Sequence, residues 1–167
     1  MVEDIHGPIR PVAKRHRKLL VVVDDSPESK VAIRFAAARA VHITGGGLIL
    51  FHCTRPGEFQ HWMAVADRMR EEARQEAEEL LASVSRRLND YCGVEPETVV
   101  TEGEPDEEVV KYISSRDDIF GLVLGAGAEG GPGPLVDYFT GAAICDLPCP
   151  VFIVPGHMTY DQVDSMA

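Results

Sequence analysis

Residues 119–136, with the sequence IFGLVLGAGAEGGPGPLV, constrain the fold of this chain more than any other stretch. They begin as a short apolar run, which is the pattern of a strand buried on both faces. A loop with five glycines and two prolines follows, and a helix is expected from Pro134. A buried strand leading through a glycine-rich turn into a helix is where α/β proteins hold phosphates, because backbone N–H groups point at the anion there. The stretch therefore predicts an α/β protein of nucleotide-binding ancestry.

Apolar runs and amphipathic segments alternate along the rest of the chain. Strands are expected at 19–23, 48–51, 98–101, 119–124 and 151–154. Helix signals lie between them, such as Ser26 as an N-cap before Pro27 and an apolar stripe from Ala66 through Met69 to Leu88. Because crossovers between parallel strands are right-handed, the order β-α-β-α-β-α-β-α-β predicts a doubly wound, five-stranded parallel sheet.

The length of 167 residues suits one domain. We expect a flexible tail at 1–16, the domain at 17–156 and a C-terminal tail at 157–167. The formal net charge of −11 makes nucleic acid and anionic membrane surfaces unfavourable partners. No apolar run has the length of a signal-peptide core or a membrane span, which favours a cytoplasmic protein.

The four cysteines predict reduced thiols rather than a disulfide framework or a metal centre. Cys53, Cys92, Cys145 and Cys149 show no C-x-x-C spacing. A metal site built on Cys145 and Cys149 would need further ligands, and none stands nearby in the sequence. We therefore expect no bound metal.

Four motifs between residues 18 and 155 resemble the universal stress protein family. They are VVVDDSPES after the first strand, EGEPDEEVV after the third, VLGAGAEGG after the fourth, and LPCPVFIVPG at the end. The resemblance implies a Rossmann-like fold of the adenine-nucleotide α-hydrolase type, with strand order 3-2-1-4-5. It also implies a homodimer that pairs through the last strand, here Val151, Phe152, Ile153 and Val154.

The resemblance also implies a nucleotide site. Family members that bind ATP place an acid after the first strand near the adenosine, and this position is matched here by Asp24. Their phosphates lie on a loop of the form G-x-x-G, nine residues, then G-[ST]. If the site is retained with ATP and magnesium, its residues are Asp24, Ser26, Gly125, Gly127, Gly130 and Gly131.

The loop departs from that pattern. Gly127 and Gly130 satisfy its first half, but the closing pair then falls on Thr140 and Gly141, in the reverse order. Counting back from Pro148 instead places the closing pair near residues 137 and 138, which are Asp and Tyr. Either alignment breaks the motif.

The chemistry of the loop agrees with the broken motif. Pro132 and Pro134 carry no N–H for a phosphate. Glu129 and Asp137 add negative charge, and no Lys or Arg stands in the loop to offset it. We therefore predict that the chain does not bind ATP, and magnesium bridging of the charges keeps ATP binding as the alternative.

Other motifs support no competing assignment. GAGAEG, at residues 125–130, fits the dinucleotide fingerprint but lies in the last βα unit, and no Gly-Lys-[ST] occurs anywhere. Asp24 could act as a phospho-acceptor in a response-regulator receiver, but that fold needs a late Lys and the last one is Lys111. A structural interpretation is favoured, in which Asp24 caps a strand end, Ser26 caps a helix and His52 is held by a hydrogen bond.

One apolar stretch remains without an assignment. Phe59, His61, Trp62 and Met63 form either a patch that docks a partner over the crevice or the start of the long helix. The chain is accordingly predicted to be a non-catalytic, dimeric stress-response protein that acts through partners. The alternatives are an ATP-binding switch of the same family and a small nucleotide hydrolase.

Overall fold

The computed structural model describes residues 17–43, 45–57 and 63–167. Five parallel strands form one sheet in the order β3-β2-β1-β4-β5, which confirms the order that the family resemblance implies. The strands are β1 (Lys18–Val22), β2 (Gly47–Thr54), β3 (Glu97–Glu102), β4 (Ile119–Ala126) and β5 (Val151–Pro155). The helices are α1 (Pro27–His42), α2 (Met63–Cys92), α3 (Pro105–Ser114), α4 (Pro134–Thr140), the 3-10 helix η1 (Ala142–Asp146) and α5 (Tyr160–Met166).

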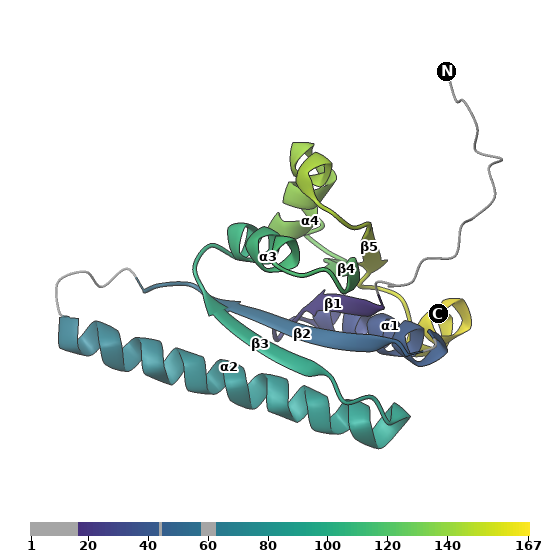
Figure 1. Ribbon diagram of the computed structural model, residues 1–167, viewed down its shortest axis with the longest axis horizontal. Coiled ribbons are helices and arrows are strands. Elements are labelled where there is room, and N and C mark those ends of the chain that lie inside the picture. Colours follow the sequence, from purple (N-terminus) through teal and green to yellow (C-terminus); the bar gives the residue numbers. More distant parts are fainter. Residues whose placement is uncertain (1–16, 44, 58–62) are drawn as a thin grey trace.

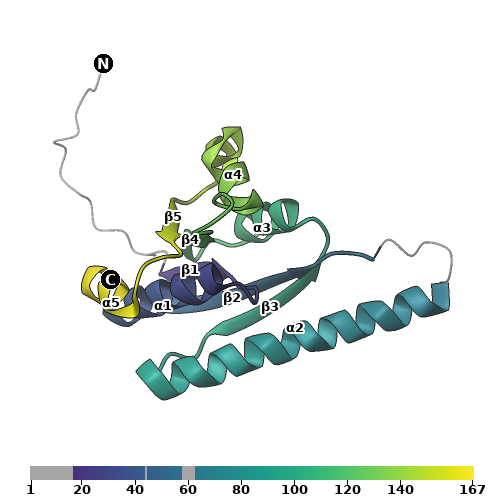
Figure 2. The ribbon, with the colours of Figure 1, turned by 180° about the vertical axis from the view of Figure 1, so that it is seen from behind.

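Helices cover both faces of the sheet. Figure 1 shows α3 and α4 on one face and α1, α2 and α5 on the other, and Figure 2 shows the same layers from behind. Side chains alternate between the two faces along each strand, so Leu19 and Val21 pack against α1 while Leu20 packs towards α3 and α4. This double burial explains why the strands read as continuous apolar runs.

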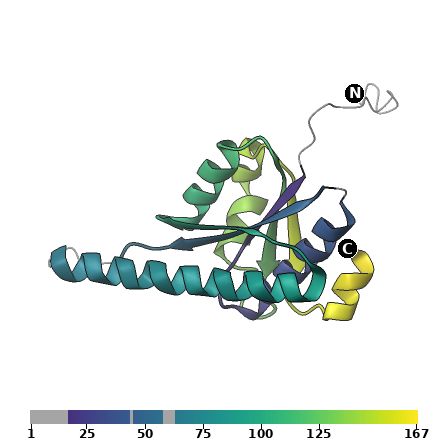
Figure 3. The ribbon, with the colours of Figure 1, turned by 60° about the horizontal axis from the view of Figure 1, so that its bottom comes forward.

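The long helix α2 is buried over only part of its length. Ala77, Leu81 and Leu88 are buried, whereas Met69, which the sequence places in the apolar stripe, is 43% exposed. Figure 3 shows the cause, because the N-terminal part of α2 extends past the sheet. The apolar stripe of the sequence is therefore covered by the sheet over only part of the helix. No helix in the described parts of the chain is long and apolar enough to cross a bilayer.

The C-terminal segment contains a helix that the sequence analysis does not predict. Thr159 accepts a hydrogen bond from the backbone of Gln162, and the Gln162 side chain accepts one from the backbone of Thr159, which makes a capping box. Val163 is fully buried among the residues that pack around α1. The segment is thus part of the packed structure.

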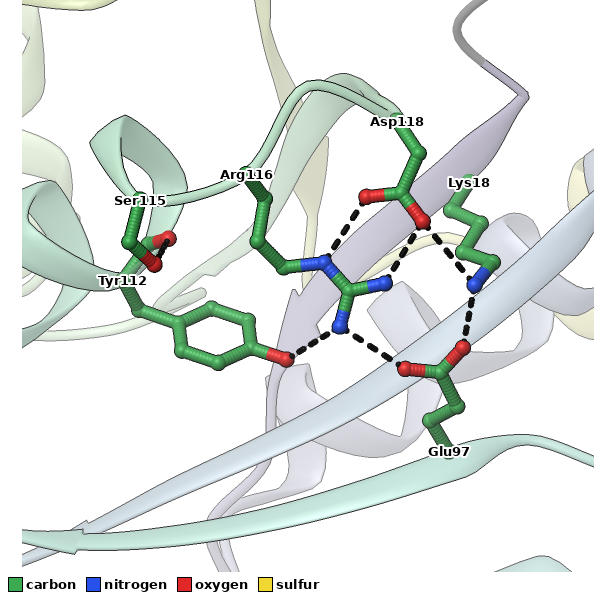
Figure 4. A network of polar contacts seen from close by, with 6 residues as sticks. All are labelled: Lys18, Glu97, Tyr112, Ser115, Arg116 and Asp118. Atoms are coloured by element: carbon green, nitrogen blue, oxygen red, sulfur yellow. Dashed lines mark hydrogen bonds and ion pairs between the residues drawn. The ribbon is translucent and has the colours of Figure 1, made fainter.

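A polar network fastens the amino-terminal ends of three strands (Figure 4). Arg116 donates to both carboxylate oxygens of Asp118, at 2.7 and 2.6 Å, and also to Glu97 and to the Tyr112 hydroxyl, both at 2.9 Å. Lys18 pairs with Glu97 and with Asp118. The Arg116 guanidinium holds the pKa of Asp118 well below its usual range. The network lies at the edge of the sheet opposite the strand ends that form the crevice.

Candidate functional site

The crevice lies at the carboxyl ends of β1 and β4. These two strands are neighbours in the sheet, and β1 pairs with β2 on its other side. The chain therefore reverses its winding direction between β1 and β4, which is where open α/β sheets bind ligands. Two hollows open at this edge, and both are lined by Asp24 and Leu135.

The turn from β1 into α1 is held by its own side chains. The Asp24 carboxylate accepts hydrogen bonds from the N–H of Ser26, at 2.9 Å, and from the Ser26 hydroxyl. Ser26 Oγ accepts from the N–H of Ser29 at 3.2 Å and so caps α1. The Asp24 N–H donates to Ser29 Oγ at 3.0 Å. The structural interpretation of Asp24 and Ser26 is therefore confirmed, and their role in a nucleotide site stays a prediction.

The predicted site glycine Gly125 belongs to β4 and not to the loop. It pairs with Val154 of β5, so the strand runs beyond the expected end at residue 124. A Cβ on Gly125 would lie 2.4 Å from the carbonyl oxygen of Glu28 in the first turn of α1. The close approach of β4 to α1 therefore explains this glycine without a ligand.

The glycine loop closes on itself. The N–H of Gly127 donates to the carbonyl of Pro132 at 3.1 Å, and a Cβ on Gly127 would lie 2.6 Å from the carbonyl oxygen of Gly131. Gly130 and Gly131 have positive φ values of 74° and 104° and are exposed. Gly127 thus offers its N–H to the loop, whereas a phosphate-binding loop would direct it at an anion.

Glu28 faces the loop from α1. Its Oε1 lies 3.7 Å from the Cβ position of Gly127, and Gly156 approaches its side chain from the end of β5. The adjoining hollow measures about 110 Å³. It is lined by Val22, Asp24, Ser26, Glu28, Ser29, Leu124, Gly125, Pro132, Gly133, Pro134, Leu135 and Val136. This lining contains two carboxylates and no cationic side chain, and the volume lies below the roughly 300–1,000 Å³ of ligand pockets.

The second hollow measures about 320 Å³ and lies between the ends of β1 and β2 and the start of α3. Its charged lining consists of Asp24, Glu104, Asp106 and Arg55. The volume is at the lower end of the range for ligand pockets. Acids outnumber the single arginine, so this hollow favours a neutral or cationic group over an anion.

His52 and Cys53 line the second hollow, and both are held by backbone carbonyls. His52 Nδ1 lies 2.7 Å from the carbonyl oxygen of Val23, so this nitrogen carries the hydrogen and donates it. The structural interpretation of His52 is therefore confirmed. Cys53 Sγ donates to the carbonyl of Gly103 at 3.4 Å, and burial raises the pKa of its thiol. A thiol in this state is a poor nucleophile.

Three residues of the crevice are missed by sequence reasoning. Ser29 is the buried polar group that accepts from Asp24, Glu28 faces the glycine loop, and Arg55 places the one cation in the second hollow. Each stands next to a predicted element in the sequence. The sequence carries no signal for the roles of Glu28 and Ser29, since helix starts are commonly acidic and polar. Arg55 belongs to no motif.

The structure describes only one of the two predicted interaction surfaces, the edge strand β5. Phe59, His61 and Trp62 lie outside the described residues, as does the side chain of Met63, so the docking patch stays a prediction. β5 is an edge strand, with Val154 buried, Val151 and Phe152 half-buried and Ile153 39% exposed. Within the described segments no group of three or more His, Cys, Asp or Glu residues is placed to hold a metal ion.

Comparisons with known proteins agree on one family. The family model described as the universal stress protein family matches residues 15–155. The universal stress protein UspA from Lactobacillus plantarum has a similar structure, with a TM-score of 0.70, 17% identity, and coverage of 84% of this chain and 99% of that chain. A search of curated protein sequences gave no match.

Two further solved structures hold nucleotides. The universal stress protein from Archaeoglobus fulgidus in complex with dAMP has a TM-score of 0.57 and 21% identity, covering 84% of this chain and 99% of that chain. A family protein from Arabidopsis thaliana with AMP bound has a TM-score of 0.57 and 18% identity, covering 83% and 91%. At these identities the likeness concerns the fold alone.

Proposed function

Since this chain belongs to the universal stress protein family, we propose that it is a non-catalytic stress-response protein that acts as a homodimer through protein partners and does not bind ATP. Its four cysteines are free thiols, which suits a reducing cytoplasm. The crevice is then an inherited feature of the fold whose phosphate side no longer receives an anion.

One observation carries the proposal, namely the position of Glu28 against the glycine loop. Its carboxylate stands at the loop that would have to receive a triphosphate, and the hollow beside it has no cationic side chain in its lining. Unit like charges about 4 Å apart repel by roughly 4 kcal/mol at an effective dielectric constant near 20. The N–H of Gly127 is also donated to Pro132, so binding a phosphate there would require breaking that bond.

A second candidate function is an adenine-nucleotide-binding switch of the same family. It is favoured by the second hollow, which lies beside Asp24 and has a volume within the range of small-molecule sites. Bound dAMP and AMP in the two solved structures support the same candidate by analogy of fold. Under this candidate the adenosine part occupies the second hollow and the phosphates extend towards Gly130.

A nucleotide hydrolase is the third candidate, and no described residue favours it. His52 donates its Nδ1 hydrogen to a backbone carbonyl, and it forms no hydrogen bond with a serine or cysteine of the described residues. A panel of nucleotides incubated with magnesium and the full chain should show no turnover. Release of phosphate at a rate that scales with protein concentration and survives repurification would establish an enzyme instead.

Calorimetric titration of the full chain with ATP and magnesium, beside a titration with adenosine, tests the proposal. We expect no heat from ATP up to about 1 mM, which corresponds to binding weaker than roughly 4 kcal/mol. Heat from adenosine but not from ATP would also support the proposal, because it would show that the phosphate groups prevent ATP from binding. The matched variant Glu28→Gln keeps the shape and removes the charge, and it should bind ATP more tightly than the wild type.

Binding of ATP by the wild type would overturn the proposal if it depends on the glycine loop. ATP binding at micromolar affinity that is lost in Gly130→Asp would overturn the proposal and establish the nucleotide switch. Gly130 is suited to this test because a Cβ there would meet no atom within 4 Å, so the variant adds charge without a clash at the Cβ. Its positive φ costs some stability, and far-UV circular dichroism of the variant controls for folding.

A further inference from the structure

A groove between α1, α2 and α5 has a volume of about 660 Å³, which is larger than either hollow of the crevice. Figures 1 and 3 show α5 beside α1 and near the C-terminal end of α2, on the face of the sheet away from α3 and α4. We propose that this groove binds a single amphipathic anion, namely a long-chain carboxylate. The proposal is independent of the function proposed for the crevice.

The floor of the groove is apolar and well packed. Ile33, Ala37 and Leu88 are at most 7% exposed and belong to the core around α1. The upper walls are exposed aromatic and aliphatic side chains, with Tyr91 77% exposed and Val41 50% exposed. The groove thus combines a packed apolar floor with exposed apolar walls, and its volume lies within the range of small-molecule sites.

The rim of the groove is basic in a chain that is strongly acidic overall. Lys30, Arg34 and Arg87 line it, and the only acid in the lining is Asp164. Asp164 is engaged by Arg34, whose Nε lies 2.7 Å from its Oδ1. Lys30 and Arg87 form no ion pair with any described residue. Two positive charges thus stand uncompensated beside an apolar trough, while the chain as a whole carries −11.

The groove is formed before any ligand arrives. α5 is fixed by the buried Val163, by its capping box and by the Arg34–Asp164 pair. Arg34 also lies over the ring of Tyr160, with its Cζ 5.5 Å from the ring centroid. Because this wall is already ordered, a ligand does not have to immobilise its side chains on binding. Less conformational entropy is lost, and binding retains more of its favourable free energy.

These features together select the ligand class. The apolar floor stabilises a bound hydrocarbon chain in proportion to the apolar area that binding buries. A carboxylate head can accept hydrogen bonds from the guanidinium of Arg87 or the ammonium of Lys30. A metal cation is excluded because the lone acid is already paired, and a neutral apolar ligand would leave the basic rim unused.

Titration of the full chain with dodecanoate, below its critical micelle concentration, tests the inference by calorimetry and by amide chemical-shift changes. We expect saturable binding of one molecule per chain, with shifts confined to α1, α5 and the end of α2. Arg87→Glu should weaken binding about tenfold. Arg86→Glu is the matched control, because Arg86 is the exposed sequence neighbour that does not line the groove, and its effect should stay within about twofold.

Two further measurements keep the test decisive. Ala38→Phe fills the trough from a half-buried position on α1, and it should abolish binding even if Arg87→Glu fails to fold. Dodecylammonium, with the same chain and the opposite charge, should bind at least tenfold more weakly than dodecanoate.

Several outcomes would overturn the inference. They are absence of saturation by dodecanoate, equal weakening by Arg86→Glu and Arg87→Glu, equal affinity for dodecylammonium, and heat that arises only above the micelle concentration. Dissociation of a dimer by Arg87→Glu, seen by light scattering without ligand, would mean that a second copy of the chain occupies the groove.

Discussion

The carbonyl oxygen of Glu28 lies 2.4 Å from the position that a Cβ on Gly125 would occupy. This contact joins the end of β4 to the first turn of α1, the two elements that border the phosphate side of the crevice. Backbone atoms meet there, so no side-chain rotation can relieve a clash. The contact links the packing of the domain to the small size of the hollow beside it.

Replacement of Gly125 by alanine should therefore destabilise the protein. The added methyl group forces β4 and α1 apart, and overpacking of this kind costs about 1–3 kcal/mol. Urea unfolding followed by circular dichroism measures the change. Gly141→Ala is the control, since a Cβ there would lie at an ordinary 3.4 Å from its nearest neighbour and should cost less than about 1 kcal/mol. Equal losses in both variants would contradict the contact.

The polar network at the other edge of the sheet predicts a dependence of stability on pH. Arg116 lowers the pKa of Asp118, and Lys18 lowers that of Glu97. A lowered folded-state pKa means that the native state binds fewer protons than the unfolded state. The stabilisation is therefore fully present above the unfolded pKa values of about 4 and is lost as the pH falls through the folded ones.

Asp118→Asn isolates this effect. At pH 7 it should lower the free energy of unfolding by about 1–2 kcal/mol, because a partly exposed, charge-assisted pair is lost. The gap to the wild type should shrink as the pH falls below about 4. Asp90→Asn is the control, because Asp90 is exposed on α2 and makes no ion pair or hydrogen bond with the described residues. A gap that stays constant down to pH 2, a value chosen to lie about two units below the unfolded pKa, would contradict the assignment.

The strand order could be predicted because the motifs resemble a known family, and the start of α1 because its signal is local. Ser26 before Pro27 marks a helix start whatever the rest of the chain does. The meeting of Gly125 with Glu28 could not be predicted, since it depends on how two distant elements pack. A glycine after a buried strand is typical of a phosphate-binding loop, but a glycine also allows two backbones to approach closely. The sequence alone does not distinguish these two roles.

The helix α5 was beyond sequence reasoning for a different reason. Its sequence YDQVDSM holds few apolar residues, so no amphipathic stripe is visible. Its one buried residue, Val163, is buried by contact with the residues around α1, and this contact is not visible in the sequence. The groove that α5 walls therefore has no counterpart in the sequence pattern, whereas the crevice does.

Loss of the α5 cap should loosen this helix without unfolding the domain. Thr159→Ala removes the oxygen that accepts from the N–H of Gln162, which costs about 1 kcal/mol of helix stability. Amide hydrogen exchange should accelerate at 160–166 and stay unchanged in the central strands. Ser165→Ala, at the exposed end of the same helix, leaves the capping box intact and should have a smaller effect. Acceleration throughout the sheet would show that α5 is instead a cooperative part of the core.

Dimerisation through β5 gives the last prediction. β5 ends the sheet in the strand order, and a strand edge with free N–H and C=O groups pairs readily with another chain. Ile153, 39% exposed on this strand, would be buried by such a partner. Ile153→Asp should therefore convert a dimer into a monomer, measured by light scattering at micromolar concentration. Ile144→Asp makes the same substitution at a residue of η1 that is 45% exposed, and it should leave the dimer intact. A wild-type protein that is monomeric under these conditions would remove the dimer from the proposed function.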